Sequence, residues 1–141
     1  MPQASVLART AGTLSVLPVL AFAPNVTAGE MAEISDAARY PAAQCAALWY
    51  GFDDYARLSA FLDRNDGDLA RAEAFRDVAY RLDGGRTERV DAFVTGQRRL
   101  MTRMIEAMIY GGDEQSRDVF RRLAATCESL AAEHPETEAL R

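Results

Sequence analysis

Lysine is absent from this chain of 141 residues, and histidine occurs once, at His134. All 16 basic side chains are therefore arginines. Without lysine, the chain has no Schiff-base nucleophile, no anchor for pyridoxal phosphate and no P-loop lysine. His134 precedes Pro135 close to the end of the chain, which is a poor setting for a general base. The residue types on which much enzymatic chemistry depends are thus scarce.

Motifs that bind cofactors are also missing. The sequence contains no C-x-x-C-H motif for haem, no glycine-rich phosphate loop and no metal-ligand spacing of histidine, cysteine and carboxylate. The segment 63–68 looks at first like a calcium loop, but an EF-hand needs glycine at position 6 and glutamate at position 12. With Asp63 at position 1, Gly67 falls at position 5 and Ala74 at position 12. We expect a helix-to-helix turn there, with no metal and no cofactor.

Net positive charge is lacking as well, since the formal net charge is −5 and the pI is about 4.9. A field of this sign repels nucleic acid and anionic lipid, so we expect no nucleic-acid partner. Hydrophobic residues make up 49% of the chain, which is enough for a single core in a chain of one-domain length.

A membrane-spanning hydrophobic run is the next absence. Residues 11–23 carry no charge, but a helix of this length is too short to cross a bilayer, which takes about 20 residues. A short apolar run after Arg9 is typical of a signal peptide, and the small-x-small sequence 26–28 provides a cleavage site. We expect a signal peptide over residues 1–28, a mature protein in the periplasm or secreted, and no membrane span after cleavage. An uncleaved membrane anchor is the alternative.

Helical periodicity is what the chain does contain. Four segments carry apolar residues at alternating steps of three and four, and glycine, proline or polar turn residues separate them. The four stripes are Cys45, Leu48, Phe52, Tyr55, Ser59 and Leu62; Leu69, Ala72, Phe75, Ala79 and Leu82; Val90, Val94, Gln97, Met101, Met104 and Met108; and Ser116, Phe120, Leu123, Cys127 and Leu130. No alternating run predicts a strand.

Short connections between these segments predict an all-α fold, an antiparallel up-down four-helix bundle over residues 29–133. Residues 30–39 can form a short extra N-terminal helix, and residues 134–141 are expected to be a frayed tail. Pro41 suits the first helical position, and the glycine pairs 84–85 and 111–112 suit helix ends. The expected caps of the second, third and fourth helices are Asp66 or Asp68, Thr87 and Asp113.

The two cysteines are predicted to form a disulfide. Cys45 lies near the start of the first helix and Cys127 near the end of the fourth, and both lie on apolar stripes. In an up-down bundle these two helix ends meet, and in an oxidising compartment two cysteines of a small domain usually pair. The alternative is two separate thiols that act as small hydrophobic residues in the core.

Trp49 belongs to the densest aromatic segment, residues 49–55, and lies beside the stripe of the first helix. It either anchors a partner, as exposed aromatic residues often do, or seals a bundle whose other walls are alanine. Asp53 and Asp54 are expected to face away from the stripe. Adjacent residues point about 100° apart on a helix, so these carboxylates cannot share a proton as a catalytic pair would.

Arginines cluster on the third helix at Arg98, Arg99 and Arg103 and on the fourth at Arg117, Arg121 and Arg122, and together they can form a basic patch for an anionic partner. The alternative is a solvated face that carboxylates such as Glu106 partly neutralise. The methionines at 101, 104 and 108 are expected to be core, although methionine can also be a metal ligand or an adaptable binding surface.

These absences and patterns favour an exported, non-enzymatic helical interaction protein: an adaptor, inhibitor, chaperone or accessory subunit. The expected partner is another envelope protein, and the candidate partner surface comprises Trp49, Arg98, Arg99 and Arg103. The alternative function is a bundle that binds a small ligand or an ion in a cavity lined by Gln97, Tyr55 and the methionines. An enzyme that uses Asp53, Asp54 or Glu106 is not expected, and the sequence leaves the oligomeric state open.

Overall fold

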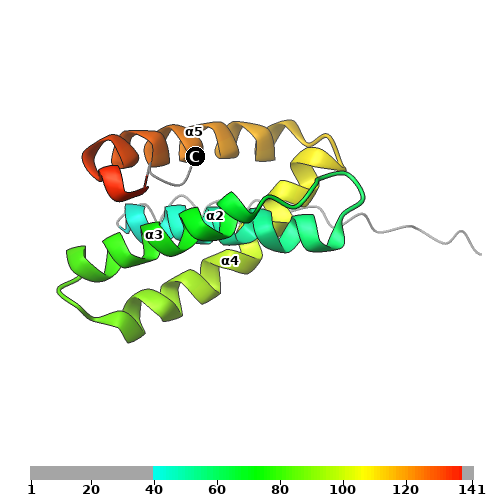
Figure 1. The fold of residues 1–141 in the computed structure, drawn as a ribbon. Helices are drawn as coiled ribbons and strands as arrows, with labels where there is room; N and C mark the ends of the chain where they lie inside the picture. Colours follow the sequence, from blue (N-terminus) through cyan, green and yellow to red (C-terminus); the bar gives the residue numbers. More distant parts are fainter. Residues whose placement is uncertain (1–39, 138–141) are drawn as a thin grey trace, which may run out of the picture.

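The computed structural model describes residues 40–137, shown in colour in Figure 1. This part of the chain contains no strand; its helices are α2 (Pro41–Leu58), α3 (Asp66–Leu82), α4 (Thr87–Ile109), α5 (Glu114–Glu133) and the short 3-10 helix η2 (Pro135–Thr137). The predicted all-α class and the four predicted helices are confirmed. The expected signal peptide, the expected helix at 30–39 and residues 138–141 lie outside the described residues.

Helix starts follow the sequence in part. Pro41 is the first residue of α2, and the Asp113 carboxylate caps α5 by accepting a hydrogen bond of 2.7 Å from the Ser116 amide, both as predicted. The predictions for the other two helices are wrong. Asn65, the residue before Asp66, caps α3, because its side-chain oxygen accepts a hydrogen bond from the Gly67 amide. Thr87 is the first helical residue of α4, so it cannot be the cap.

The end of α2 also differs from the expectation that its stripe continues to Leu62. The helix ends at Leu58, and Ser59 adopts an extended conformation with φ −96° and ψ 141°. The Ser59 hydroxyl accepts a hydrogen bond of 2.9 Å from the Phe61 amide, an alternative to the helical pattern that serine often provides. Residues 59–65 therefore form a connection and do not continue the helix.

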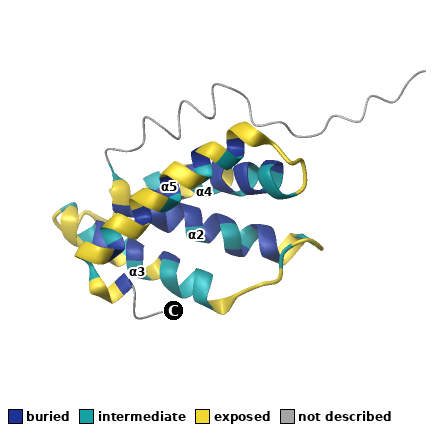
Figure 2. Ribbon diagram, turned by 90° about the horizontal axis from the view of Figure 1, so that it is seen from above, coloured by how far each residue is buried: buried dark blue, intermediate teal, exposed yellow. Residues whose placement is uncertain are grey.

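The helix α2 lies at the centre and contacts α3, α4 and α5. Every residue from Ala42 to Leu48 is buried, and Figure 2 shows α2 dark blue along most of this stretch. A bundle helix with a single apolar stripe keeps its other face in water, so α2 is more enclosed than its predicted stripe indicates. Small side chains explain it, since alanine lets neighbouring helices approach on several sides at once.

The helices α2 and α4 approach each other closely at Gly51. A Cβ atom at this position would stand 2.8 Å from the Met101 Cβ atom and 3.0 Å from the Thr102 backbone nitrogen. No side chain fits in that space, and glycine is therefore required for the observed contact between the two helices. Met101 and Met104 are completely buried, which supports their interpretation as core residues.

The sulfur atoms of Cys45 and Cys127 lie 2.07 Å apart and their Cα atoms 5.6 Å apart, so the predicted proximity of the two cysteines is confirmed. These values match those of protein disulfides. The bond links the first part of α2 to the last part of α5 across a sequence separation of 82 residues.

The described part of the predicted frayed tail is ordered. The Thr137 side chain is buried, and its hydroxyl donates a hydrogen bond of 2.8 Å to the His134 carbonyl oxygen. Glu136 forms an ion pair with Arg81 of α3. Residues 134–137 therefore hold α5 against α3, a contact that local sequence did not reveal.

None of the helices within residues 40–137 is long and apolar enough to span a bilayer.

Candidate functional site

The α4 arginines of the predicted basic patch lie in a groove between α2 and α4, with a volume of about 670 Å³. We call it the arginine groove. Its charged lining residues are Asp54, Arg57, Arg98, Arg99, Arg103 and Glu106. The three α4 arginines singled out from the sequence therefore come together on one surface, and a fourth arginine from α2 joins them. The arginines of α5 that were expected to join them do not line this groove, and Arg117 and Arg121 pair with carboxylates of their own helix.

The arginines of this groove differ in how they are held. Arg98 binds the Asp54 carboxylate with two nitrogens, and its Nη2 atom lies 2.5 Å from Oδ1. This hydrogen bonding raises the pKa of Arg98, and the guanidinium also lies 4.8 Å above the centre of the Tyr50 ring. Arg99 is exposed, and no carboxylate within residues 40–137 reaches ion-pair distance of it. The groove thus combines one fixed arginine with one that is available to a partner.

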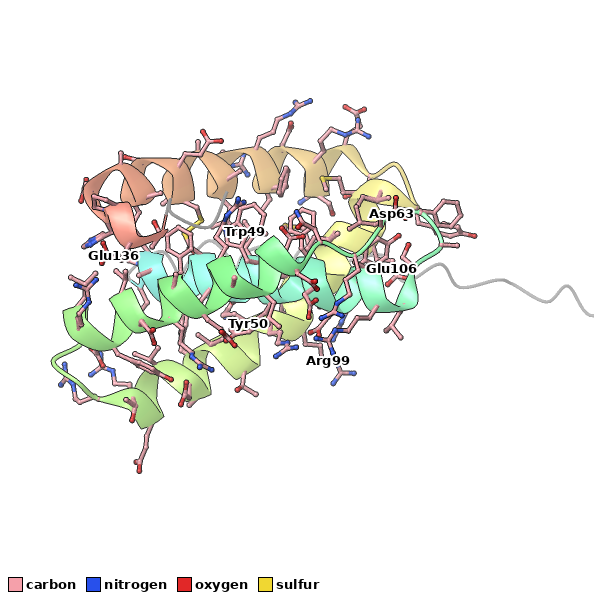
Figure 3. All side chains as sticks on the ribbon, in the orientation of Figure 1. Trp49, Tyr50, Asp63, Arg99, Glu106 and Glu136 are labelled. Atoms are coloured by element: carbon pink, nitrogen blue, oxygen red, sulfur yellow. A yellow bond between two sulfur atoms is a disulfide. The ribbon has the colours of Figure 1, made fainter. Side chains whose placement is uncertain are left out.

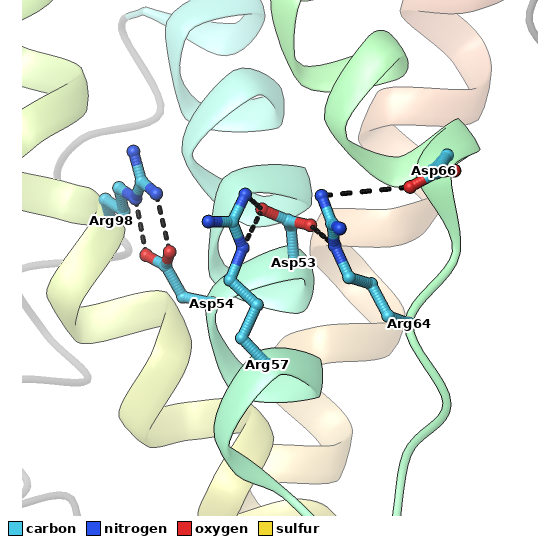
Figure 4. A network of polar contacts seen from close by, with 6 residues as sticks. All are labelled: Asp53, Asp54, Arg57, Arg64, Asp66 and Arg98. Carbon is cyan, nitrogen blue, oxygen red and sulfur yellow. Dashed lines mark hydrogen bonds and ion pairs between the residues drawn. The ribbon is translucent and has the colours of Figure 1, made fainter.

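Asp53 lies next to Asp54 but has its own partners (Figure 4). Its carboxylate accepts a hydrogen bond of 2.9 Å from Arg57 and one of 3.0 Å from Arg64. Burial alone would raise the pKa of Asp53, but the hydrogen bonds and charges of Arg64 and Arg57 outweigh it, so the pKa is lowered. The lowered pKa keeps the Asp53 carboxylate ionised near neutral pH, so it is unsuited to act as a general acid.

The expectation that Asp53 faces away from the packed side of α2 is wrong, because its side chain is completely buried. The physical reason is that α2 is covered on more than one side, and the partner Arg64 lies on the connection after the helix. Periodicity along a single helix cannot show a partner 11 residues further on.

An apolar cluster adjoins the arginine groove. Leu58, Phe61 and Tyr110 are 88%, 65% and 66% exposed, and the ring centres of Phe61 and Tyr110 lie 5.2 Å apart. Leu58 also lines the groove. We call these three residues the apolar tip. Sequence reasoning missed it, because these residues lie at or beyond the ends of α2 and α4, where the stripe pattern gives no information.

Trp49 lies in a different hollow, of about 550 Å³, whose lining residues come mainly from α2, α3 and α5 (Figure 3). We call it the Trp49 hollow. Its lining includes Trp49, Arg71, Phe75, Phe120, Cys127 and Glu128. The hollow and the arginine groove share no lining residue. The candidate partner surface from the sequence is therefore divided between two places.

Trp49 is half-buried within an aromatic row. Its ring stacks on Phe52 with centres 5.5 Å apart, and Phe52 meets the Phe120 ring edge to face at 5.7 Å. The Arg71 guanidinium lies 4.2 Å above the Trp49 ring, a cation-π contact. The Trp49 Nε1 atom is buried and finds no hydrogen-bond acceptor among the described residues.

Other sequence candidates take structural positions. Gln97 is buried and its Oε1 atom has no partner within the described part, while Tyr55 is packed in the core. Neither they nor the methionines line the groove or the hollow. In residues 40–137, no three residues among histidine, cysteine, aspartate and glutamate are grouped so that they could hold a metal ion.

Comparison of the chain with protein-family models, with curated proteins and with solved structures gives no match. The arginine groove with its apolar tip, and the Trp49 hollow, are therefore the features from which a function can be inferred.

Proposed function

We propose that this chain is an exported, non-enzymatic interaction protein whose arginine groove and apolar tip bind an acidic segment of another envelope protein. The observation that carries this proposal is that the exposed Leu58 lines the groove and lies three residues before Phe61, whose ring packs on that of Tyr110. Large exposed apolar side chains beside arginines are common in protein interfaces, where the apolar groups supply burial and arginine supplies directed hydrogen bonds.

Charge complementarity defines the partner. Four arginines and two carboxylates line the groove, although the whole chain carries a formal net charge of −5. A segment with carboxylates beside apolar residues would place the former on Arg99 and the latter on Phe61 and Tyr110. Such pairing steers association and determines orientation more than it raises affinity.

Export and helix order belong to the same proposal. A signal peptide over residues 1–28 would deliver the chain to the periplasm or the medium, where a bond between Cys45 and Cys127 would persist. We also assign the four helices an alternating, up-down order. The short connections after α3 and α4 and the proximity of the two cysteines support it.

The alternative of ligand binding inside the helical core receives less support. Met101 and Met104 are fully buried, and the residues expected to line an internal cavity are packed among other side chains. The Trp49 hollow, on the surface, is a better candidate for a ligand site than the core.

Site-specific crosslinking in the native host tests the interaction. A photoreactive phenylalanine analogue would replace Phe61 or Tyr110 in the tip, with Leu82 as the matched control. Leu82 is 63% exposed but ends α3, away from the groove. We expect one discrete crosslinked partner from Phe61 and Tyr110, none from Leu82, and loss of the product when Arg99→Glu reverses the charge in the groove. Equal products from all three positions, or none from the tip, would refute the proposal.

A further inference from the structure

The Trp49 hollow has the size and shape of a small-molecule site. Its volume of about 550 Å³ falls within the range of roughly 300–1,000 Å³ that is usual for ligand pockets. Phe75, which is 1% exposed, Cys127 and Ala131 provide apolar surface in its lining. Trp49 and Phe120, which both contact Phe52, add aromatic surface to the lining.

Among the described residues that line this hollow, Arg71 is the one with a cationic side chain. Its guanidinium is held over the Trp49 ring at 4.2 Å, and no carboxylate in the described part of the chain lies within ion-pair distance of it. An arginine that is positioned by stacking keeps its planar donors free for a carboxylate, which it can bind with two parallel hydrogen bonds.

The Trp49 Nε1–H group is enclosed by the protein and has no acceptor among residues 40–137. Because this atom is not accessible from the hollow, Arg71 is left as the donor for a ligand oxygen.

From this combination we propose that the Trp49 hollow binds a small aromatic carboxylate. The ring would lie on the apolar lining, and the carboxylate would accept hydrogen bonds from Arg71. Two opposing charges weaken the binding of an anion: Glu128, which is exposed and also lines the hollow, and Asp68, whose charge interacts with that of Arg71. This site is separate from the arginine groove and does not depend on the proposed protein partner.

Titration with 3-phenylpropionate tests the site, and its neutral amide, 3-phenylpropionamide, is the matched ligand. Trp49 is the only tryptophan of the chain, so its fluorescence reports on the hollow directly. For a ligand of this size we expect saturable binding with a Kd on the order of 1 mM. The amide should bind about tenfold more weakly, because it lacks the charge that Arg71 recognises.

Three variants identify the groups involved. Arg71→Gln should raise the Kd of the carboxylate about tenfold and remove its advantage over the amide, and Glu128→Gln should lower the Kd severalfold. Arg99→Gln, in the arginine groove, should change nothing, which separates this site from the proposed partner surface. Ala124→Leu, which adds volume at the edge of the hollow, should weaken both ligands, and it keeps the test decisive if Arg71→Gln alters the fold.

Several results would overturn the proposal. These are absence of saturation at concentrations well above the expected Kd, equal affinity for carboxylate and amide, or an effect of Arg99→Gln as large as that of Arg71→Gln. Removal of residues 138–141 gives a further test, because the described chain ends at Thr137 in the lining of the hollow. Binding that appears only after this truncation would mean that the tail, and not a free carboxylate, is the natural occupant.

Discussion

The two halves of α2 are buried by different means. From Ala42 to Leu48 the helix is enclosed through small side chains and is linked to α5 by the cysteine pair. From Asp53 onward it is held by charge, since Asp53 binds two arginines and Asp54 binds a third. The first half therefore depends on shape and the second on ionisation, and each should respond to its own kind of perturbation.

The largest effect is expected at the cysteine pair. A bond that closes a loop of 82 residues limits the unfolded chain, which in the loop-entropy description stabilises the fold by about 4.5 kcal/mol. Urea unfolding with and without a reductant measures this difference. The double variant Cys45→Ser/Cys127→Ser should start at the lower stability and show no further response to the reductant. A wild-type protein that is indifferent to reduction would contradict the prediction.

A smaller effect is expected at Gly51, the contact of α2 with α4. The variant Gly51→Ala would place a Cβ atom 2.8 Å from the Met101 Cβ atom, and such overpacking costs about 1–3 kcal/mol. Gly96 in α4 is the matched control, because a Cβ there meets nothing within 4 Å. Gly96→Ala should stabilise the helix by about 0.5–1 kcal/mol. Equal changes in the unfolding free energy of both variants would show that the two helices are less close.

Asp53 tests the charged half. Replacement by asparagine removes hydrogen bonds between charged groups, and we expect a loss of about 1–2 kcal/mol, reduced because both arginine partners are nearly half exposed. The lowered pKa of Asp53 also predicts a pH dependence. This contribution is present above the unfolded-state pKa, near 3.8, and is lost as the pH falls through the lower folded-state value. Acid titration of stability should therefore be less steep for Asp53→Asn than for the wild type.

The smallest effect is expected at the pair of Asp54 and Arg98. Both side chains are partly exposed, so the pair should contribute about 0.5 kcal/mol and lose part of it in high salt. A double-mutant cycle with Asp54→Asn and Arg98→Gln measures the coupling free energy. A coupling as large as the loss at Asp53 would remove the distinction between a buried and a half-exposed carboxylate.

The fold was predictable where a single helix carries its own signal. The four helices, the start at Pro41 and the cap at Asp113 follow from local pattern, whereas the proximity of the cysteines was predicted from the expected order of the helices as well. The burial of Asp53 was not predictable, because it depends on Arg64 in the next connection and on cover from several helices. The early end of α2 was missed because Ser59 continues the stripe but forms a competing hydrogen bond.

The sequence indicated which residues belong to the candidate sites, but not which of them lie together in the fold. Arg98, Arg99 and Arg103 share a groove because they lie within two turns of one helix. Their grouping with Trp49 was not confirmed, since Trp49 lies in the hollow lined from α2, α3 and α5. The apolar tip and Arg71 were missed, because each acquires its surroundings only when separate helices pack together.

The intact mass of the protein from its native host tests the proposed export and the bond between the two cysteines at once. Measured without reductant, this mass should equal that of residues 29–141 less two hydrogens, and the deficit should disappear on reduction. A full-length mass that shows no such deficit would contradict both.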